Sequence, residues 1–141
     1  MLEIHFAQSP EEIRRCFPVM SLLRPQLGEH EFVSRVQVQQ AQGFQLVAAE
    51  DGGQVVAVAG FRILEVLATG RTLYVDDLVT DDTRRSRGYG KAMLDWLQDY
   101  AREQGCETFS LDSGTHRQEA HAFYFRERMR VTSFHFAKKL R

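Results

Sequence analysis

The residues that could do chemistry concentrate in one stretch, LVTDDTRRSRGYGK, which runs from Leu78 to Lys91. In it an apolar strand end is followed by an arginine-rich turn, two glycines and the start of a predicted helix. The first N–H groups of a helix have no partner within it and carry a partial positive charge, so they can bind a phosphate. Gly88 and Gly90 have no side chain, so an anion can approach their backbone closely. The pattern predicts a phosphate site, and the alternative is a solvated turn with a helix cap.

Four cationic side chains favour the anion site over that alternative, because Arg84, Arg85, Arg87 and Lys91 lie within one short segment. They belong to an uneven charge distribution. Residues 1–83 carry 6 Lys and Arg against 12 Asp and Glu, whereas the rest of the chain carries 12 against 7. The near-neutral total of −1 therefore hides a basic second half, which predicts a localised anionic ligand. The acidic first half favours a cationic or amino substrate.

The elements that must position this segment follow from hydrophobic periodicity and from turn and cap signals. Ser9 and Pro10 mark the start of the first helix, Asp51-Gly52-Gly53 marks a hairpin, and Gly105 is a plausible helix end. The predicted strands are 2–6, 44–50, 54–63, 73–80, 108–111 and 131–137; the predicted helices are 10–24, 29–41, the segment between Gly90 and Gly105, and 118–128. Hairpins followed by strand–helix units predict an α/β sheet with helices on both faces.

Two motifs then resemble a known family. Arg85-x-x-Gly88-x-Gly90 matches the (Q/R)-x-x-G-x-(G/A) signature of the GNAT acyltransferases, which bind acetyl-CoA at a strand–turn–helix. The segment 117–124, RQEAHAFY, is similar to the family's penultimate helix, in which a tyrosine follows A-x-x-(F/L). Residues 44–141 resemble the family well, and the form is most similar to small-amine acetyltransferases, the aminoalkylphosphonate branch among them. The resemblance implies one GNAT domain over residues 1–141, with a mixed, mostly antiparallel central sheet.

The resemblance also implies the cofactor site, with acetyl-CoA as co-substrate. The strand residues expected along the pantetheine arm are Leu78, Val79 and Thr80. Backbone groups of the following turn and helix start are expected to hold the pyrophosphate: Arg85, Ser86, Arg87, Gly88, Tyr89, Gly90 and Lys91.

Two catalytic roles follow from the same resemblance. The Leu78 N–H is expected to polarise the thioester carbonyl, because a developing oxyanion needs a donor already in place. Tyr124 is expected to act as the general acid that protonates the departing thiolate, since a phenol with a pKa of about 10 has a similar basicity. The alternative for Tyr124 is core packing beside Phe123. His116 and His121 are expected on the helix surface or in a cap.

An amine acceptor must also lose a proton, and Asp77 is the candidate base. Adjacent residues of a regular strand face opposite sides, so at most one of Asp76 and Asp77 is expected to face the acceptor. Asp76, a histidine or a water chain could serve instead, and the aspartates could be solvated charges or an anchor for a cationic substrate. Tyr74 is a further candidate for the pocket.

Two positions depart from the family pattern. Arg128-Met129 stands where the family has a glycine followed by an aromatic residue, and an arginine in the left-handed conformation costs about 1 kcal/mol. Asp82 replaces the proline that is usual in the basic turn.

Together these observations predict an N-acetyltransferase that transfers an acetyl group to a primary amine of a small molecule or peptide. Transfer is expected by direct attack in a ternary complex, without a metal or a covalent enzyme intermediate. Cys16 and Cys106 are expected to be packing residues, and the absence of a signal peptide or apolar span predicts a cytoplasmic protein. A homodimer is expected from the resemblance, and neither a membrane nor a nucleic acid is an expected partner. The alternatives are a non-catalytic acetyl-CoA-sensing domain and a basic nucleic-acid-binding module.

Overall fold

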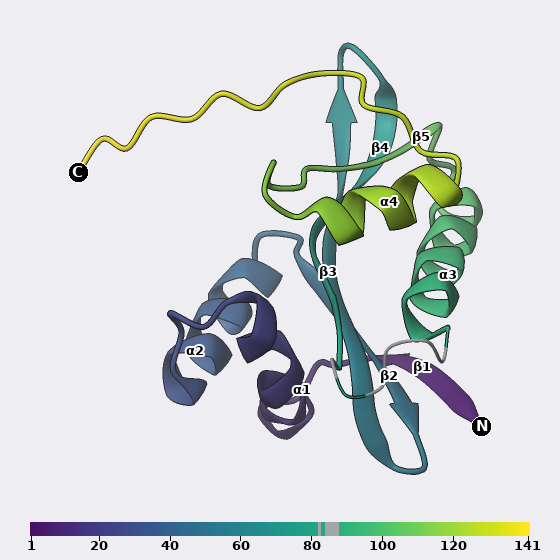
Figure 1. Ribbon diagram of the computed structural model, residues 1–141. Helices are drawn as coiled ribbons and strands as arrows, with labels where there is room; N and C mark the ends of the chain where they lie inside the picture. The colour runs from purple at the N-terminus through teal and green to yellow at the C-terminus, as the bar shows by residue number, and fades with distance from the viewer. Residues whose placement is uncertain (82, 84–87) are drawn as a thin grey trace. The chain divides into compact units, whose positions relative to one another are not determined.

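A five-stranded sheet in the order β1-β2-β3-β4-β5 organises the chain (Figure 1). The computed structural model describes residues 1–81, 83 and 88–141, which divide into two units, residues 1–110 and 111–141. The strands are β1 (Leu2–Phe6), β2 (Gln45–Asp51), β3 (Gln54–Val66), β4 (Gly70–Thr80) and β5 (Thr108–Leu111). The helices are α1 (Pro10–Leu23), α2 (Glu29–Gln40), α3 (Tyr89–Glu103) and α4 (Gln118–Arg126). The elements therefore follow the predicted order up to α4.

Antiparallel pairing connects β1 to β2, β2 to β3 and β3 to β4. The β2–β3 turn contains Gly52 and Gly53 with φ angles of 61° and 78°, which is the positive region that a tight hairpin requires. Between β4 and β5 the chain passes through α3, so it crosses over where the other strands are joined by hairpins or by α1 and α2. The predicted α/β architecture, with a mostly antiparallel sheet, is confirmed.

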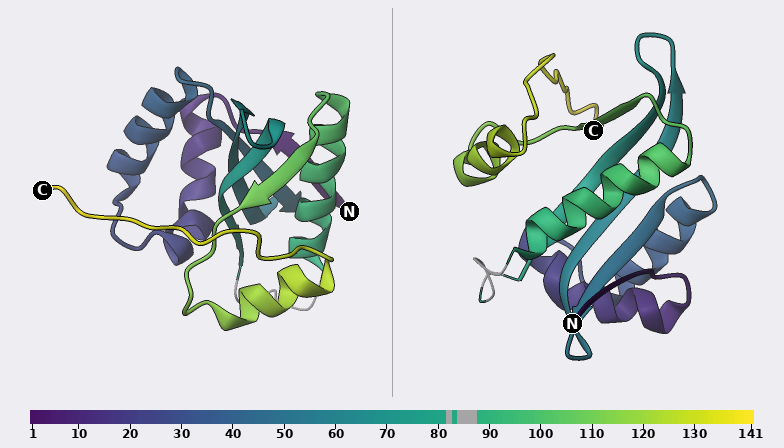
Figure 2. Two further views of the ribbon diagram at one scale, coloured as in Figure 1. Left: turned by 90° about the horizontal axis from the view of Figure 1, so that it is seen from above. Right: turned by 90° about the vertical axis from the view of Figure 1, so that its right-hand side faces the viewer.

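Helices cover both faces of the sheet in the first unit (Figure 2). Helices α1 and α2 pack on one face, where Ile13, Phe32, Leu46 and Val58 belong to one buried cluster. Helix α3 lies on the other face and contacts β3 and β4. There the ring of Phe61 meets that of Tyr100 edge-on at 5.6 Å between centroids. The apolar positions spaced along α3 thus form the buried face that their periodicity predicts.

Local signals fix the helix ends. At α1, the Ser9 hydroxyl accepts a hydrogen bond from the Glu12 N–H, and the Glu12 carboxylate accepts one from the Ser9 N–H. This capping box confirms the predicted start. After α3, the Gly105 N–H donates to the Arg102 carbonyl and the Cys106 N–H to the Ala101 carbonyl. Those two bonds, with Gly105 at φ 75°, form a Schellman motif at the predicted helix end.

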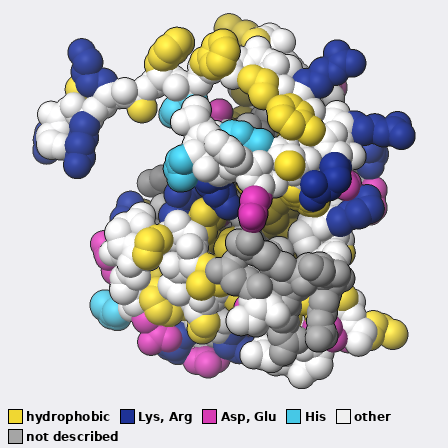
Figure 3. Space-filling view, viewed as in Figure 1, with side chains coloured by type: hydrophobic (Ala, Val, Ile, Leu, Met, Phe, Trp, Pro, Cys, Tyr) yellow, Lys and Arg dark blue, Asp and Glu magenta, His cyan; other side chains and the backbone are white. Residues whose placement is uncertain are grey.

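The second unit contains α4 and an extended C-terminal segment, residues 129–141. The predicted strand over 131–137 does not form, because a strand needs a hydrogen-bonding neighbour and these residues have none in the described chain. Its large apolar side chains are exposed instead, with Phe134 and Phe136 at 80% and 92%. Figure 3 shows hydrophobic side chains along this segment and basic ones at its end. None of the described helices is long and apolar enough to span a membrane.

Candidate functional site

A β-bulge in β4 places Asp76 and Asp77 on the same face of the sheet. Phe61 of β3 pairs with Val75, but Gly60, the residue before it, pairs with Asp77, so Asp76 is an extra residue on β4. The bulge interrupts the alternation of side chains, and both aspartates face α1 and α2. The expectation that at most one of them faces the acceptor pocket is therefore wrong, because it assumed a regular strand.

Each aspartate has its own arginine. The Arg62 guanidinium donates to Asp76 through two bonds, Nε to Oδ1 at 3.0 Å and Nη2 to Oδ2 at 2.7 Å. From the end of α1, the Arg24 Nε donates to Asp77 Oδ1 at 2.8 Å. Burial raises the pKa of the Asp77 carboxyl, and the neighbouring Arg24 only partly opposes that shift. Asp77 Oδ2 has no hydrogen-bond partner among the described residues and is free to accept one.

These residues line a cavity of about 260 Å³ between α1, α2 and the bulge, which we call the acceptor cavity. Phe44 and the arginines Arg24, Arg35 and Arg62 contribute to its wall beside the two aspartates. Tyr74 is not among the lining residues. A cavity of about 390 Å³ near the start of β2 is lined only by uncharged side chains and offers no acid or base. The acceptor cavity is therefore the better candidate for proton transfer.

Gly60 leaves room for the ring of Phe44, which lines the acceptor cavity. A Cβ atom at this position would lie 2.3 Å from Cζ of the Phe44 ring and 3.4 Å from Asp77 Oδ2. The Phe44 ring fills the space that a side chain would take, and the Arg62 guanidinium lies over that ring at 5.7 Å from its centroid. Gly60 is needed here for a close approach, because any larger residue would push Phe44 out of place.

The charge of the acceptor cavity differs from the charge of the half that builds it. Residues 1–83 are acidic overall, yet three arginines face two aspartates in the cavity. The excess of acidic residues in this half of the sequence therefore does not extend to the cavity wall. The sum over a long segment includes acids such as Glu11 and Glu31, whose side chains lie on exposed helix surfaces.

The start of α3 holds the described part of the predicted phosphate site. Gly88 is the N-cap, with φ 77° in the left-handed region and no side-chain cap, and the first turn contains no acid. Among the described residues no side chain caps this helix N-terminus, and the binding of an anion there stays a prediction. The Tyr89 hydroxyl donates to Asp51 Oδ2 at 2.5 Å, which ties this turn to β2. Lys91 forms an ion pair with Asp95 at 3.4 Å.

The rest of the predicted cofactor site lies on β4 or outside the described residues. Leu78 pairs with Ala59, Val79 with Val58 and Thr80 with Ala57, so all three belong to the ordered β3–β4 ladder immediately after the bulge. Arg85, Ser86 and Arg87 lie outside the described residues. The acceptor cavity and the open helix end thus lie at the two ends of the segment 76–88, with Leu78 next to Asp77.

Tyr124 belongs to α4, in the second unit, and is partly buried beside Phe123 with ring centroids 5.5 Å apart. Burial raises the pKa of its phenol. The α4 end is a second Schellman motif, in which the Met129 N–H donates to the Tyr124 carbonyl and Arg128 adopts φ 68°. The arginine thus takes the left-handed conformation that glycine usually takes. His121 Nε2 lies 2.8 Å from the Gly114 carbonyl, which is consistent with its predicted role in a cap.

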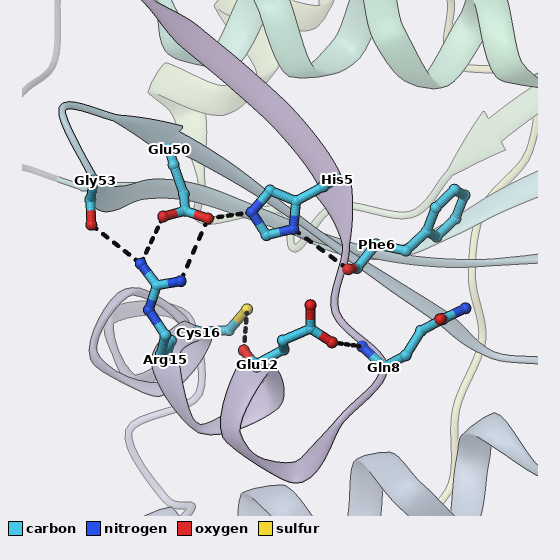
Figure 4. Close-up of polar contacts among 8 residues, drawn as sticks. All are labelled: His5, Phe6, Gln8, Glu12, Arg15, Cys16, Glu50 and Gly53. Carbon is cyan, nitrogen blue, oxygen red and sulfur yellow. Dashed lines mark hydrogen bonds and ion pairs between the residues drawn. The ribbon is translucent and has the colours of Figure 1, made fainter.

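A polar cluster lies at the junction of α1, β1 and β2, and none of its residues lines the acceptor cavity (Figure 4). His5 Nε2 contacts Glu50 Oε2, and Arg15 donates to both oxygens of Glu50, from Nη2 to Oε1 at 2.5 Å and from Nη1 to Oε2 at 3.4 Å. The Arg15 Nη2 also donates to the Gly53 carbonyl at 3.0 Å. Cys16 next to it is fully buried, and burial raises the pKa of its thiol to about 12. The cluster fastens α1 to the hairpin, and Cys16 is a packing residue, as predicted.

The sequence did not single out Arg24, Arg62, Gly60 or Phe44. Arg24 and Arg62 reach the aspartates from 53 and 14 residues away, so no local spacing connects them. An isolated glycine inside an otherwise apolar strand, as Gly60 is, indicates a bulge or a close approach and was the one available signal.

Known proteins resemble this chain in sequence. The sequence model of the acetyltransferase (GNAT) family matches residues 10–129. An uncharacterised N-acetyltransferase of Bacillus subtilis (strain 168), YhdJ, is 36% identical over 124 residues, which cover 86% of this chain and 87% of that protein. An aminoalkylphosphonate N-acetyltransferase of Salmonella typhimurium (strain LT2) is 33% identical over 66 residues, covering 47% of this chain and 43% of that protein.

Solved structures share the fold. The ribosomal-protein-alanine N-acetyltransferase of Brucella melitensis biovar Abortus 2308 superposes with a TM-score of 0.84 at 17% identity. The superposition covers 99% of this chain and 100% of the other. At this identity the likeness concerns the fold alone.

Proposed function

The chain belongs to the GNAT acetyltransferase family as an N-acetyltransferase, and we propose that it transfers the acetyl group of acetyl-CoA to a primary amine. The observation that carries the proposal is the succession along β4 and α3. A charged acceptor cavity with a buried carboxylate at Asp77 adjoins Leu78, and an uncapped helix N-terminus follows at Gly88. An amine site and a phosphate site on one strand–turn–helix are what acetyl transfer requires.

The described part of the phosphate site fits acetyl-CoA. Gly88 lacks a side chain, a Cβ there would meet no atom of the described residues within 4 Å, and α3 has no acid in its first turn to repel a pyrophosphate. We propose that backbone groups of residues 85–91 bind the pyrophosphate and that Leu78, Val79 and Thr80 bind the pantetheine arm. When bound, acetyl-CoA supplies an activated thioester carbonyl.

Three groups of the chain handle the charges and protons in the proposed direct attack. Asp77 Oδ2 accepts the proton that the amine loses, and its raised pKa makes it a better base than an exposed aspartate. The Leu78 N–H donates to the carbonyl oxygen as negative charge grows on it while the amine nitrogen bonds to the carbonyl carbon. Tyr124 donates a proton to the sulfur as the carbon–sulfur bond breaks. A phenol with an ordinary pKa of about 10 is protonated at neutral pH, and burial raises the pKa of Tyr124 further.

The decisive experiment measures CoA release with an amine panel for the wild type and for Tyr124→Phe. Loss of a general acid lowers kcat by about 100-fold or more, while the affinity for acetyl-CoA stays the same. The matched control is Tyr100→Phe, which removes the hydroxyl of a tyrosine stacked on Trp96 in α3. Unchanged turnover in Tyr124→Phe would remove Tyr124 from the mechanism. A melting shift with acetyl-CoA but no transfer to any amine would instead indicate a sensing domain.

The Asp77 role has its own test. Asp77→Asn removes the proton acceptor but keeps the shape, so the rate falls by about 100-fold or more at neutral pH and the acidic limb of the pH–rate profile disappears. Asp76→Asn serves as the comparison, because Asp76 is held by Arg62 through both carboxylate oxygens. Equal losses in the two variants would assign both aspartates to substrate anchoring and not to proton transfer.

We propose further that residues 1–141 act as one GNAT domain in the cytoplasm and form a homodimer. The family match runs from residue 10 to residue 129 and so includes most of both units. The two cysteines are free, which suits a reducing compartment. The exposed Val131, Phe134 and Phe136 support the dimer, since a second copy could bury them. Light scattering tests this: Phe134→Ser with Phe136→Ser should give monomers, and a wild-type monomer would contradict the proposal.

A further inference from the structure

The charges of the acceptor cavity define the class of acceptor, on the premise that the proposed function is correct. We propose that the substrate is a small zwitterionic amine, that is, a primary amine carrying a carboxylate, phosphonate or phosphate group. Its amine would lie at Asp77 and its anionic group at the guanidinium of Arg35. The argument proceeds from the pairing of the charges in the cavity.

Two of the three arginines are committed to the aspartates. Arg62 forms a two-bond pair with Asp76, and Arg24 contacts Asp77 Oδ1 and also the Asp76 carbonyl at 3.3 Å. These pairs balance each other's charge and hold the carboxylates in place. The remaining charge of the cavity wall is therefore the single positive charge of Arg35.

Arg35 is available for a ligand. Its only ion pair in the described chain is with Glu31, one turn earlier in α2, at 3.8 Å and with both side chains more than half exposed. Such a pair contributes little, and none of the hydrogen bonds among the described residues holds this guanidinium. A carboxylate or phosphonate can offer it two parallel hydrogen bonds, which are stronger and more directional than the contact with Glu31. An anionic group on the substrate is thus the partner that Arg35 lacks.

Asp77 provides the negatively charged end of the acceptor cavity. Arg24 occupies Oδ1, whereas Oδ2 is left for an amine, and the Asp77 side chain is only 17% exposed, so it forms the buried end of the cavity. Since Arg35 stands on α2 and is largely exposed, the cavity has a negative inner end and a positive rim. A neutral or purely cationic amine would satisfy only the inner end.

The volume limits the size of the acceptor. At about 260 Å³, the cavity is smaller than the sites of roughly 300–1,000 Å³ that take drug-sized ligands. A short chain between the amine and the anion fits this space, whereas a peptide segment would have to extend beyond it. A small molecule is therefore a better fit to this cavity than a peptide as the amine acceptor.

The test compares amines of matched length. Initial rates are measured with 3-aminopropanoate, 2-aminoethylphosphonate and O-phosphoethanolamine, and with propylamine as the uncharged-tail control. We expect kcat/KM to be at least about 10-fold higher for one of the three zwitterions than for propylamine, and the preferred one identifies the anionic group. A preference for propylamine, or no preference, overturns the inference.

Arg35→Gln then assigns the preference to one side chain. The variant should raise KM for the preferred zwitterion by about 10- to 100-fold and leave KM for propylamine unchanged, with little effect on kcat. Arg14→Gln is the matched control, because Arg14 also lies on an exposed helix face beside a glutamate, Glu11, but does not line the cavity. Equal effects on both amines, or an effect of Arg14→Gln of the same size, contradict the inference.

Calorimetry separates this inference from the proposed function. Binding of 2-aminoethylphosphonate and 3-aminopropanoate is measured with CoA present, so no transfer is needed. If either binds and Arg35→Gln abolishes the binding while no amine is acetylated, the inference stands and the acetyltransferase proposal fails. If propylamine is acetylated and neither zwitterion binds, the acetyltransferase proposal stands and the inference fails.

Discussion

Helices α1 and α3 both begin with backbone N–H groups that have no partner within the helix, but the residues around the two helix starts differ. At α1 the chain supplies its own partners, since Ser9 and Glu12 form a capping box and Pro10 has no N–H that would need an acceptor. At α3 the N-cap is Gly88, none of the described side chains caps the first N–H groups, and no acid lies in the first turn. Of the four helices, α3 alone combines these features in the described chain. A helix start that the chain leaves open is the one to examine for a ligand.

The largest expected effect comes from making the α3 start resemble the α1 start. Gly88→Asp places a carboxylate where a pyrophosphate is proposed to bind, and like charges at such distances cost several kcal/mol. The dissociation constant for acetyl-CoA, measured by calorimetry, should rise by about 100-fold or more. Gly28→Asp at the N-cap of α2 is the control, because it adds the same charge at a helix start away from the proposed phosphate site. Wild-type affinity in Gly88→Asp would refute the phosphate site at α3.

The reverse change, removing the cap of α1, should affect stability and not binding. Ser9→Ala deletes the hydroxyl that accepts from the Glu12 N–H at 3.1 Å. The expected loss is about 1 kcal/mol of unfolding free energy in urea, with the acetyl-CoA dissociation constant unchanged. A weaker acetyl-CoA complex in this variant would show that the two helix starts are coupled, contrary to the comparison.

The helix C-termini extend the comparison, because Gly105 and Arg128 hold the same position in two Schellman motifs. Arg128→Gly relieves the strain of the left-handed conformation but increases the conformational entropy of the unfolded chain. We therefore expect the free energy of unfolding in urea to rise by a net amount of about 0.5–1 kcal/mol. Gly105→Ala should lose a similar amount. A destabilised Arg128→Gly protein would mean that the arginine side chain contributes contacts that outweigh its strain.

The smallest expected effect is a pH dependence confined to α1. Hydrogen bonds from the Ser9 and Gln8 N–H groups lower the pKa of Glu12, so its ionised form stabilises the fold. That contribution is complete above the ordinary glutamate pKa and is lost as the pH falls through the lowered value. Glu12→Gln should therefore flatten the acid limb of stability measured by thermal unfolding. Glu11→Gln, which removes a partner of Arg14, is the control, and an equal flattening there would contradict the assignment.

How much of the structure can be predicted from the sequence depends on how far apart in the chain the interacting residues are. Ser9, Gly88 and Gly105 act on their immediate neighbours, so the helix ends and the open start of α3 could be predicted from a few residues. The acceptor cavity could not, because Arg24 meets Asp77 only after the chain has folded α1 onto the sheet. The failure over 131–137 has the same cause: β-prone residues form a strand only beside another strand.

The bulge between Val75 and Asp77 also makes the chain sensitive to length. One extra residue changes the phase of β4, so Leu78 shares a face with Val75 although three positions separate them. Deleting Asp76 would bring that phase back to regular alternation and leave one aspartate, not two, beside the acceptor cavity. Substitutions at this point exchange one side chain, whereas a one-residue deletion removes the geometry that puts both carboxylates on one side. Homologous chains that retain the cavity should therefore tolerate changes of residue type here more readily than changes of strand length.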